Sequence, residues 1–394
     1  MTKLKFTVIG HGHIGKRHAG IIAGLPDSEL DIVGVNSEEL RIKSDLLGKS
    51  EELRMKSDLL VNSEEVRMKS EELHADSKLL TLNSSLLILN SKLLPLNSIA
   101  AICTPNNLHC TQAIEWMQKG CDVIIEKPMG LNAAECREVI EVAKKLDRKV
   151  FCVMQNRFSP PSKWLKELLG SGRLGKIYSV QVNCLWNRNK AYYEQSTWKG
   201  KLAQDGGTLF TQFSHFVDTL FWLFGDIEPV SAQFFNHNHP YIEFEDSGVV
   251  NARGMNYELG GMSDEKVKTH NSYLIPHHSF PIQINYSTSA YGQNLESSIT
   301  ILAENGTVKV GGQYMDKVLA CEVKDYEMPE LEAIQPPNDY GHYKGSASNH
   351  AYVYQNVIDV LAGKADIACT AEEGLKVVEF IEKVYKFRGM SYEL

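Results

Sequence analysis

Three glycines near the start of the sequence have a spacing that lets a backbone bind a pyrophosphate. Gly10, Gly12 and Gly15 form a G-x-G-x-x-G pattern, with an apolar run over residues 4–9 before them and helical spacing over residues 16–23 after them. The first glycine permits a tight turn, the second lets the backbone approach the phosphates, and the third lets helix and strand pack closely. Free N–H groups at the helix start can then bind phosphate. A turn kept only for packing is the alternative, but the strand–turn–helix context favours a dinucleotide site.

The end of the second predicted strand bears on the choice of cofactor. Residues 30–35 form an apolar run that leads directly to Asn36 and Ser37. An aspartate there would bind the ribose hydroxyls and repel a 2′-phosphate, whereas an asparagine hydrogen-bonds ribose without repelling phosphate. This position therefore leaves the choice between NAD and NADP open, and we expect NAD as the cofactor, with NADP not excluded.

A lysine and a histidine further along the chain could transfer a proton. Lys127 follows the apolar run over residues 122–125, at the edge where ligands of open α/β sheets bind, and partial burial there would lower its pKa and make it a base. His215 lies in an apolar stretch with helical spacing and could act as a general acid or base. From the residues alone, a surface lysine beside a turn proline and a packed core histidine are the more ordinary interpretations.

The elements that would position these residues alternate in type over the first 154 residues. Helical spacing covers residues 109–119 and 132–146. Apolar strands are predicted over residues 4–9, 30–35, 99–103, 122–125 and 150–154. Strands that alternate with helices are typical of a parallel, doubly wound sheet. We therefore predict an N-terminal Rossmann domain over residues 1–128.

The pattern changes after about residue 155. Residues 177–183 and 298–302 alternate between apolar and polar side chains, and residues 304–307 are a hairpin signal. Residues 371–386 have the spacing of a closing amphipathic helix. The predicted fold class is therefore α/β, with a second, α+β domain over residues 129–394 that contains a mostly antiparallel open sheet.

Two stretches do not fit this scheme and are predicted to be inserts. Residues 37–98 repeat a unit of six or seven residues that begins with serine, with leucine about every seven residues. A partly helical, partly disordered low-complexity expansion is expected, and a helical partner surface is the alternative. Residues 251–280 include a string, 253–259, that nearly recurs at 388–394, and surface loops tolerate such insertions.

The composition argues against several classes of protein. The formal net charge of −8 and the lack of a basic run argue against binding to nucleic acid or to an anionic membrane. No run of eighteen uncharged apolar residues predicts a transmembrane helix, and the first glycine comes too early for a signal peptide. The eight cysteines form no Cys-x-x-Cys pair and the histidines lack the spacing of metal ligands, so we expect a cytoplasmic protein with reduced thiols and no metal.

Four motifs, in order along the chain, resemble those of the Gfo/Idh/MocA oxidoreductases. They are the glycine turn with His18, residues 103–106 with His109, the sequence Glu126-Lys127-Pro128, and residues 205–218. The resemblance implies a Rossmann domain followed by a sheet domain whose open face binds a sugar and often supports oligomers. A homo-oligomer, dimer or tetramer, that acts on a small-molecule sugar is therefore expected.

The resemblance also implies which residues bind the cofactor and which react. Lys127 and His215 match the family's two catalytic positions for the oxidation of a secondary alcohol. The inositol and glucose dehydrogenases of the family commonly carry an aspartate four residues before the histidine, where this chain has Thr211, so a Lys–Asp–His relay is not expected. The implied cofactor-binding residues are Gly10, Gly12, His13, Ile14, Gly15, Asn36, Ser37, Thr104, Pro105, Asn106, His109, Glu126 and Lys127.

A subgroup that acts on nucleotide-linked aminosugar uronates resembles the chain better. The shared features are Trp198-Lys199-Gly200, the pair Tyr192-Tyr193, and Gln212. This similarity implies oxidation of the C3 hydroxyl of UDP-N-acetylglucosaminuronate, a step in cell-surface polysaccharide biosynthesis. The expected substrate-binding residues are Arg157, Tyr193, Trp198, Thr211, Gln212 and His215.

Alternatives stay open at this point for one residue and for the function. Arg157 could bind a uronate carboxylate or a phosphate, or it could be a packing arginine at a domain junction. The function could be that of an inositol or simple-sugar dehydrogenase of the same family. It could also be that of a non-catalytic, dinucleotide-binding sensor.

Overall fold

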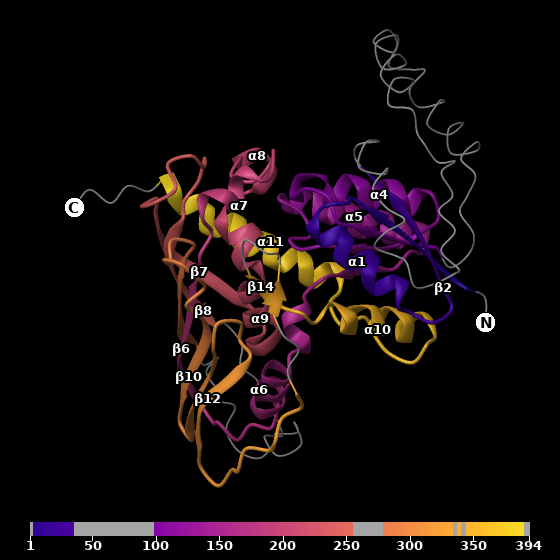
Figure 1. Cartoon of the computed structure of the whole chain (residues 1–394). Coiled ribbons are helices and arrows are strands. Elements are labelled where there is room, and N and C mark those ends of the chain that lie inside the picture. The colour runs from indigo at the N-terminus through magenta and orange to yellow at the C-terminus, as the bar shows by residue number, and fades with distance from the viewer. Residues whose placement is uncertain (1–2, 35–97, 255–278, 334–336, 340–343, 390–394) are drawn as a thin grey trace. The chain divides into compact units, whose positions relative to one another are not determined.

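The computed structural model describes residues 3–34, 98–254, 279–333, 337–339 and 344–389 (Figure 1). Asn36, Ser37 and almost all of the predicted insert over residues 37–98 lie outside these ranges, as do residues 255–278. The chain divides into two compact units, and each is described by itself. The first unit comprises residues 1–104, 111–124 and 139–150, and the second comprises residues 105–110, 125–138 and 151–394.

A five-stranded sheet forms the N-terminal part of the fold. β1 (Leu4–Ile9) pairs in parallel with β2 (Ser28–Val33) and with β3 (Ser98–Ile102). β4 (Asp122–Ile125) and β5 (Val150–Cys152) complete the order β2-β1-β3-β4-β5. Every residue of β3 and β4 is buried, as is typical of a parallel sheet covered on both faces. The predicted doubly wound α/β fold is confirmed.

Helices follow the strands of this sheet in the predicted alternation. They are α1 (His13–Ala23) after β1, η2 (Asn106–Leu108) and α4 (His109–Gln118) after β3, and α5 (Ala133–Leu146) after β4. Two glycines let α1 begin close to the sheet. Gly10 has a φ of +95°, and a Cβ there would lie 2.7 Å from the carbonyl oxygen of Cys103. A Cβ on Gly15 would lie 1.9 Å from the carbonyl oxygen of Gly10.

A seven-stranded sheet forms the core of the second unit. Its order is β12-β11-β10-β6-β9-β8-β7, and all neighbours are antiparallel except β6 and β9. The strands are β6 (Ile177–Leu185), β7 (Ile227–Phe235), β8 (Ser247–Gly254), β9 (Phe280–Ser287), β10 (Glu296–Ala303), β11 (Gly306–Gly311) and β12 (Lys317–Val323). This confirms the mostly antiparallel sheet, and it shows that the ends of the predicted insert over residues 251–280 are paired strand.

Helices cover one face of this sheet. Along β9, Phe280, Ile282 and Ile284 are buried while Pro281 and Gln283 are exposed, so the two faces differ. α6 (Pro160–Gly170) contacts β11, and α11 (Ala371–Tyr385) contacts β7 and α9 (Ser214–Phe224), on one side of the sheet (Figure 1). The remaining elements are η3 (Gln155–Phe158), α7 (Lys190–Glu194), α8 (Leu202–Asp205), η4 (Leu209–Phe213), β13 (Pro337–Asp339), β14 (Lys344–Ala347), α10 (His350–Leu361) and η6 (Lys386–Gly389).

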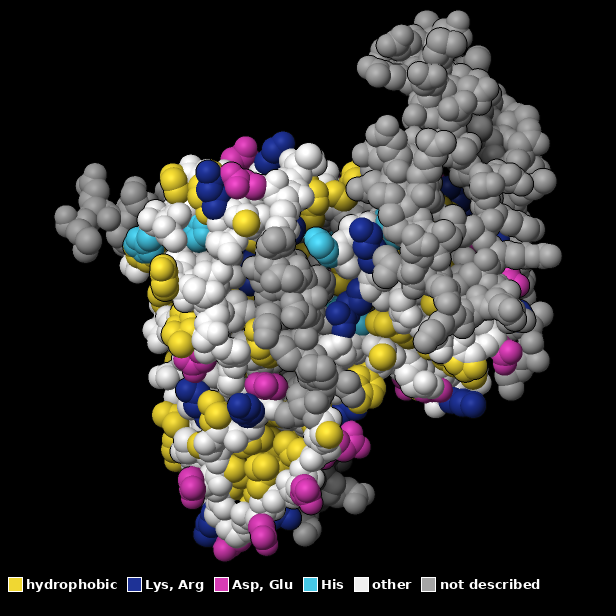
Figure 2. All heavy atoms as spheres, in the orientation of Figure 1, with side chains coloured by type: hydrophobic (Ala, Val, Ile, Leu, Met, Phe, Trp, Pro, Cys, Tyr) yellow, Lys and Arg dark blue, Asp and Glu magenta, His cyan; other side chains and the backbone are white. Residues whose placement is uncertain are grey.

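The surface carries charges of both signs. On the face shown in Figure 2, Lys and Arg side chains are interspersed with Asp, Glu and hydrophobic side chains. Among the helices of the described ranges, none combines the length and the apolar character needed to cross a membrane.

A buried arginine joins three elements of the second unit. Arg157, on η3, donates from Nη2 and Nε to both carboxylate oxygens of Asp218 on α9, at 2.6 and 2.8 Å. Its Nη1 donates to Ala368 O at 2.8 Å and to Glu373 Oε1 at 2.7 Å. Glu373 also closes the capping box of α11 with Thr370. The guanidinium therefore fixes α9 against the start of α11.

Removing one partner of this pair should destabilise the protein strongly. Asp218→Ala leaves a buried guanidinium without its main counter-charge, which costs about 3–5 kcal/mol. The exposed pair between Lys376 and Asp226, 2.7 Å apart, provides a matched control, and Asp226→Ala should cost less than about 1 kcal/mol. The measurement is the urea midpoint of both variants. Equal shifts would show that the Arg157 pair contributes no more than a surface pair.

The third glycine of the turn should be intolerant of any side chain. Gly15→Ala places a methyl group against the Gly10 carbonyl, so the turn must distort, and we expect a lower melting temperature and at least tenfold weaker NAD binding. Gly20, on the same helix, would carry a Cβ with nothing within 4 Å of it. Gly20→Ala should therefore be neutral or stabilising by up to about 1 kcal/mol. Calorimetry and an NAD titration of both variants test this, and equal behaviour would refute it.

Candidate active site

Lys127 directly follows Glu126 at the end of β4, and its polar neighbours belong to the second unit. Its Nζ donates a hydrogen bond to the main-chain oxygen of Thr211 at 2.5 Å. Burial lowers the pKa of the ammonium below its usual 10.5, and Arg188 lowers it further, whereas Glu126 and Asp205 raise it. Lys127 therefore binds its proton less tightly than an exposed lysine, as a base near neutral pH requires.

His215 is the second residue of α9, and its side chain is 2% exposed. The pKa of its imidazole depends on the charge of Lys127. Burial lowers the pKa of the imidazole well below its usual 6.5, and the positive charge of Lys127 lowers it further. Nε2 lies 3.3 Å from Gln155 Nε2, and the tautomer decides which of the two side chains donates. Nδ1 has no hydrogen-bond partner among the described residues. The imidazole of His215 is therefore neutral, and one of its ring nitrogens is available to hydrogen-bond a ligand.

Thr211 connects the lysine to a buried carboxylate. It lies on η4, a π-helical turn that leads into α9, and such turns are frequent at functional sites. Its hydroxyl accepts from Asn106 Nδ2 at 2.9 Å and hydrogen-bonds Asp205 Oδ1. Asn106 Nδ2 also donates to the main-chain oxygen of Asp205 at 2.9 Å. The structure thus brings together residues from three separate segments: Asn106, Lys127, and the pair Asp205 and Thr211.

Gln212 lies beside this network, but both ends of its amide are used within the protein. Arg188 Nε donates to Gln212 Oε1 at 2.7 Å, and Gln212 Nε2 donates to the hydroxyl of Tyr192 at 2.7 Å. The ammonium of Lys199 lies 3.8 Å from the ring centroid of Tyr192, and burial lowers the pKa of Lys199 to about 8. Each of these bonds uses one of the two lone pairs or one of the two N–H groups of the amide, so direct substrate contact by Gln212 stays a prediction.

Two further predicted substrate residues lie near this cluster, and one lies apart from it. Tyr193 packs edge-on against Tyr192 in a small buried apolar cluster, and Trp198 is half-buried beside Lys199. Arg157 donates its guanidinium hydrogens to the groups described above and is 4% exposed. Its contacts are those of a packing arginine, and they do not support the alternative role in binding a substrate anion.

The glycine turn of the first unit fits a dinucleotide. A Cβ on Gly12 would meet nothing within 4 Å, so protein packing does not require that glycine, in contrast to Gly10 and Gly15. Gly12 precedes the first residue of α1, and His13 and Ile14 begin the helix. No acidic side chain lies in the first turn of α1, so nothing there repels a phosphate.

The other predicted cofactor residues make contacts within the protein. In the first unit, Thr104 Oγ1 donates to Gln112 Oε1 at 2.7 Å. In the second, His109 Nδ1 lies 2.7 Å from Pro128 O, and Glu126 Oε2 accepts from the main-chain N–H of Lys127 at 3.0 Å. Pro105 leads into η2, on which Asn106 lies.

Sequence reasoning missed Asp205 and Lys199 as site residues. Both stand in motifs noted above, Asp205 at the start of Asp-Gly-Gly and Lys199 in Trp-Lys-Gly. Their positions in these motifs could have identified both residues as candidates. Neither motif shows that the side chains of Asp205 and Lys199 lie close enough to Lys127 to interact with its charge. The charge of Lys127 acts on both groups, and each of them acts on the other.

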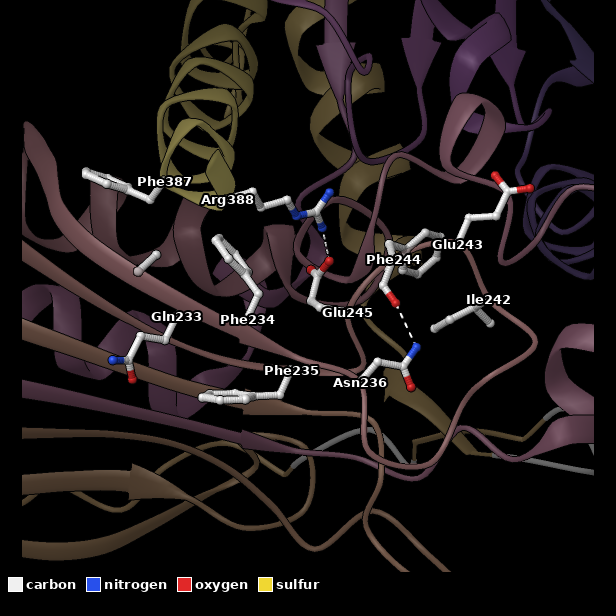
Figure 3. A pocket seen from close by; sticks show the side chains of 11 residues that line it. Gln233, Phe234, Phe235, Asn236, Ile242, Glu243, Phe244, Glu245, Phe387 and Arg388 are labelled. Atoms are coloured by element: carbon white, nitrogen blue, oxygen red, sulfur yellow. Dashed lines mark hydrogen bonds and ion pairs between the residues drawn. The ribbon is translucent and has the colours of Figure 1, made fainter. Parts of the chain in front are cut away.

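A separate cavity of about 720 Å³ lies at the end of β7, and it contains none of the predicted site residues (Figure 3). Aromatic side chains from β7 and η6 line it, among them Phe234, Phe235 and Phe387. Arg388 forms an ion pair with the buried Glu245 at its wall (Figure 3). Also in its lining, Asn236 Nδ2 donates to the main-chain oxygen of Phe244 at 2.9 Å (Figure 3).

Comparison with known proteins adds two family matches. A model of an oxidoreductase family with an NAD-binding Rossmann fold, GFO/IDH/MocA, matches residues 4–154. The model of the GFO/IDH/MocA C-terminal domain matches residues 163–309. Together the two models cover about three quarters of the chain.

Individual relatives are similar over different lengths. The chain is 33% identical over 135 residues to an uncharacterized oxidoreductase of Synechocystis and 27% identical over 127 residues to the D-glucoside 3-dehydrogenase of Escherichia coli. These alignments cover 33% and 32% of this chain, and 35% and 36% of the relatives, so the chain spans about a third of the length of these two curated relatives.

A solved structure is similar over almost the whole chain. The WlbA dehydrogenase of Bordetella pertussis, in complex with NADH and UDP-GlcNAcA, superposes with a TM-score of 0.71 and is 28% identical, with 98% of this chain and 96% of that chain covered. Both domain matches and the confirmed α/β fold lead to one assignment: the chain belongs to the GFO/IDH/MocA family of oxidoreductases and carries the family's NAD-binding Rossmann domain.

Proposed function

We propose that this protein is an NAD-dependent dehydrogenase that oxidises a secondary hydroxyl group of a sugar. The observation that carries the proposal is the presence of two desolvated bases, Lys127 and His215, in one cluster in which the charge of one acts on the other. Oxidation of an alcohol requires a base for the hydroxyl proton while hydride leaves the carbon. NAD, when bound, supplies the hydride acceptor.

Each residue has a distinct part in the proposed reaction. Neutral Lys127 accepts the hydroxyl proton, and the main-chain oxygen of Thr211 holds the ammonium that forms. The negative charges of Glu126 and Asp205 stabilise that ammonium. The single hydroxyl proton goes to Lys127, while the neutral imidazole of His215 donates a hydrogen bond from its available ring nitrogen to the same substrate oxygen.

The division of labour along the chain follows from this proposal. Residues 1–128 bind the dinucleotide, with the pyrophosphate at Gly10, Gly12 and the first turn of α1. Residues 129–394 bind the sugar over their mostly antiparallel sheet.

The charges around Lys127 support an anionic sugar as the substrate. Two cations besides Lys127 lie in the described part of the second unit: the positive charge of Arg188 acts on Lys127, and that of Lys199 acts on Asp205. Positive charge at these two positions favours a substrate that carries a carboxylate or a diphosphate over a neutral polyol. Together with the likeness to a dehydrogenase solved with UDP-GlcNAcA, it supports oxidation of the C3 hydroxyl of a UDP-linked N-acetylaminosugar uronate. A neutral inositol or simple sugar offers no negative charge for Arg188 and Lys199 to pair with.

Replacement of Lys127 tests the central assignment. Lys127→Ala should lower kcat by about 10²–10⁴ while the Kd for NAD stays the same, because the base is lost and the glycine turn is untouched. The assay follows the absorbance of NADH with UDP-GlcNAcA as substrate.

In the unaltered protein kcat/KM should rise with pH, because only the neutral lysine accepts a proton, and the midpoint should lie below 10.5. Full activity of Lys127→Ala would refute the assignment, and NAD binding without turnover of any sugar would support the sensor alternative.

Replacement of Lys199 tests the anionic substrate. Lys199→Met should raise KM for UDP-GlcNAcA about 10–100-fold, the effect of losing a charge-assisted hydrogen bond, with little change for an uncharged sugar. Lys201→Met, at an exposed position two residues away, is the matched control and should behave like the unaltered protein. Equal effects on charged and uncharged substrates would favour the simple-sugar alternative.

A further inference from the structure

A buried carboxylate beside Lys127 has no direct contact with the substrate in the proposed reaction. Asp205 is the last residue of α8 and is 1% exposed. Its Oδ2 accepts from the main-chain N–H of Gly200 at 2.7 Å, and its Oδ1 hydrogen-bonds the hydroxyl of Thr211. A buried carboxylate is costly unless it is paired, so this placement requires compensation from its surroundings.

Thr211 carries the effect of this carboxylate to Lys127. The Thr211 hydroxyl receives a hydrogen bond from Asn106 Nδ2 at 2.9 Å, so its own hydrogen is directed to Asp205, where it meets the carboxylate Oδ1 and the main-chain oxygen, the latter at 2.9 Å. The side chain is thereby held from two sides. The carbonyl of the same residue is the acceptor for Lys127 Nζ at 2.5 Å. A shift of Thr211 would therefore move the acceptor that fixes the ammonium.

Charged groups from several elements face this carboxylate. Lys127 follows β4, Lys199 precedes α8, and the positive charge of each lowers the pKa of Asp205. Arg188 follows β6, and the hydroxyl of Tyr193 on α7 also responds to the charge of Asp205. Glu126 is the second anion that acts on Lys127. Burial raises the pKa of Asp205 to about 6, so the group is anionic at neutral pH and above.

We propose that Asp205 is the positioning residue for Lys127, acting through Thr211 and supplying from α8 the carboxylate that position 211 lacks. This inference rests on the proposed function, since it assigns a role relative to the base. Asp205 aligns the Thr211 carbonyl with the ammonium and provides a negative charge to the site. It does not touch the reacting atoms.

The test is Asp205→Asn, which keeps the size of the side chain and removes the charge. We expect kcat to fall by about 10², the cost of a misplaced reacting group, with the Kd for NAD unchanged. Because Asp205 raises the pKa of Lys127, the rising limb of kcat/KM should also move to lower pH. If Asp205 had a purely structural role, the substitution would lower kcat without shifting the pH dependence of kcat/KM. Asp226→Asn, at an exposed carboxylate, is the control and should leave both unchanged.

A second pair of variants guards against a misfolded Asp205→Asn protein. Thr211→Ala removes the hydroxyl and should lower kcat about as much as Asp205→Asn does, whereas Thr211→Ser retains the hydroxyl and should lose much less. The inference is wrong if Asp205→Asn keeps the normal kcat and the normal pH dependence of kcat/KM. It is also wrong if Thr211→Ala and Thr211→Ser are equally active. If Lys127→Ala is inactive in the same experiment, such a result contradicts only the role of Asp205, and the proposed function still stands. If Lys127→Ala is fully active, the proposed function itself is wrong.

Discussion

A lysine ammonium removed from bulk water is stable only where acceptors and negative charges replace its hydration. Here the main-chain oxygen of Thr211 and the carboxylates of Glu126 and Asp205 do so, while burial and Arg188 act against the charge. The result is a lysine that gives up its proton more readily than usual and still has groups nearby to hold it. The end of β4, the π-helical turn η4 and the short helix α8 each contribute one part of this balance.

The histidine of the site depends on a different constraint. His215 lies on α9, and the helix is fixed by the ion pair between Asp218 and Arg157, one turn further along. This pair makes no use of substrate or cofactor. The placement of a residue proposed to take part in proton transfer therefore rests on a packing interaction one turn away on the same helix.

Local patterns in the sequence predicted the parts of this protein that local physics determines. The glycine turn, the alternation of strands and helices, and the positions of Lys127 and His215 relative to those elements follow from neighbours in the chain. The sequence could not show which polar groups the protein itself already uses. Arg157 has the chemistry of a substrate ligand, but Asp218 and Glu373, which come from distant segments, bind its guanidinium. For the same reason the role of Asp205 needed the folded position of Thr211.

The carboxylate of Glu373 is shared between two tasks. One oxygen accepts from the main-chain N–H of Thr370 and caps α11, and the other accepts from Arg157. Fraying at the first turn of α11 would therefore withdraw an acceptor from the guanidinium that holds α9. The two helices should therefore unfold locally as one cooperative unit. The free energy of local unfolding around His215 then depends on α11, a helix more than 150 residues further along the chain.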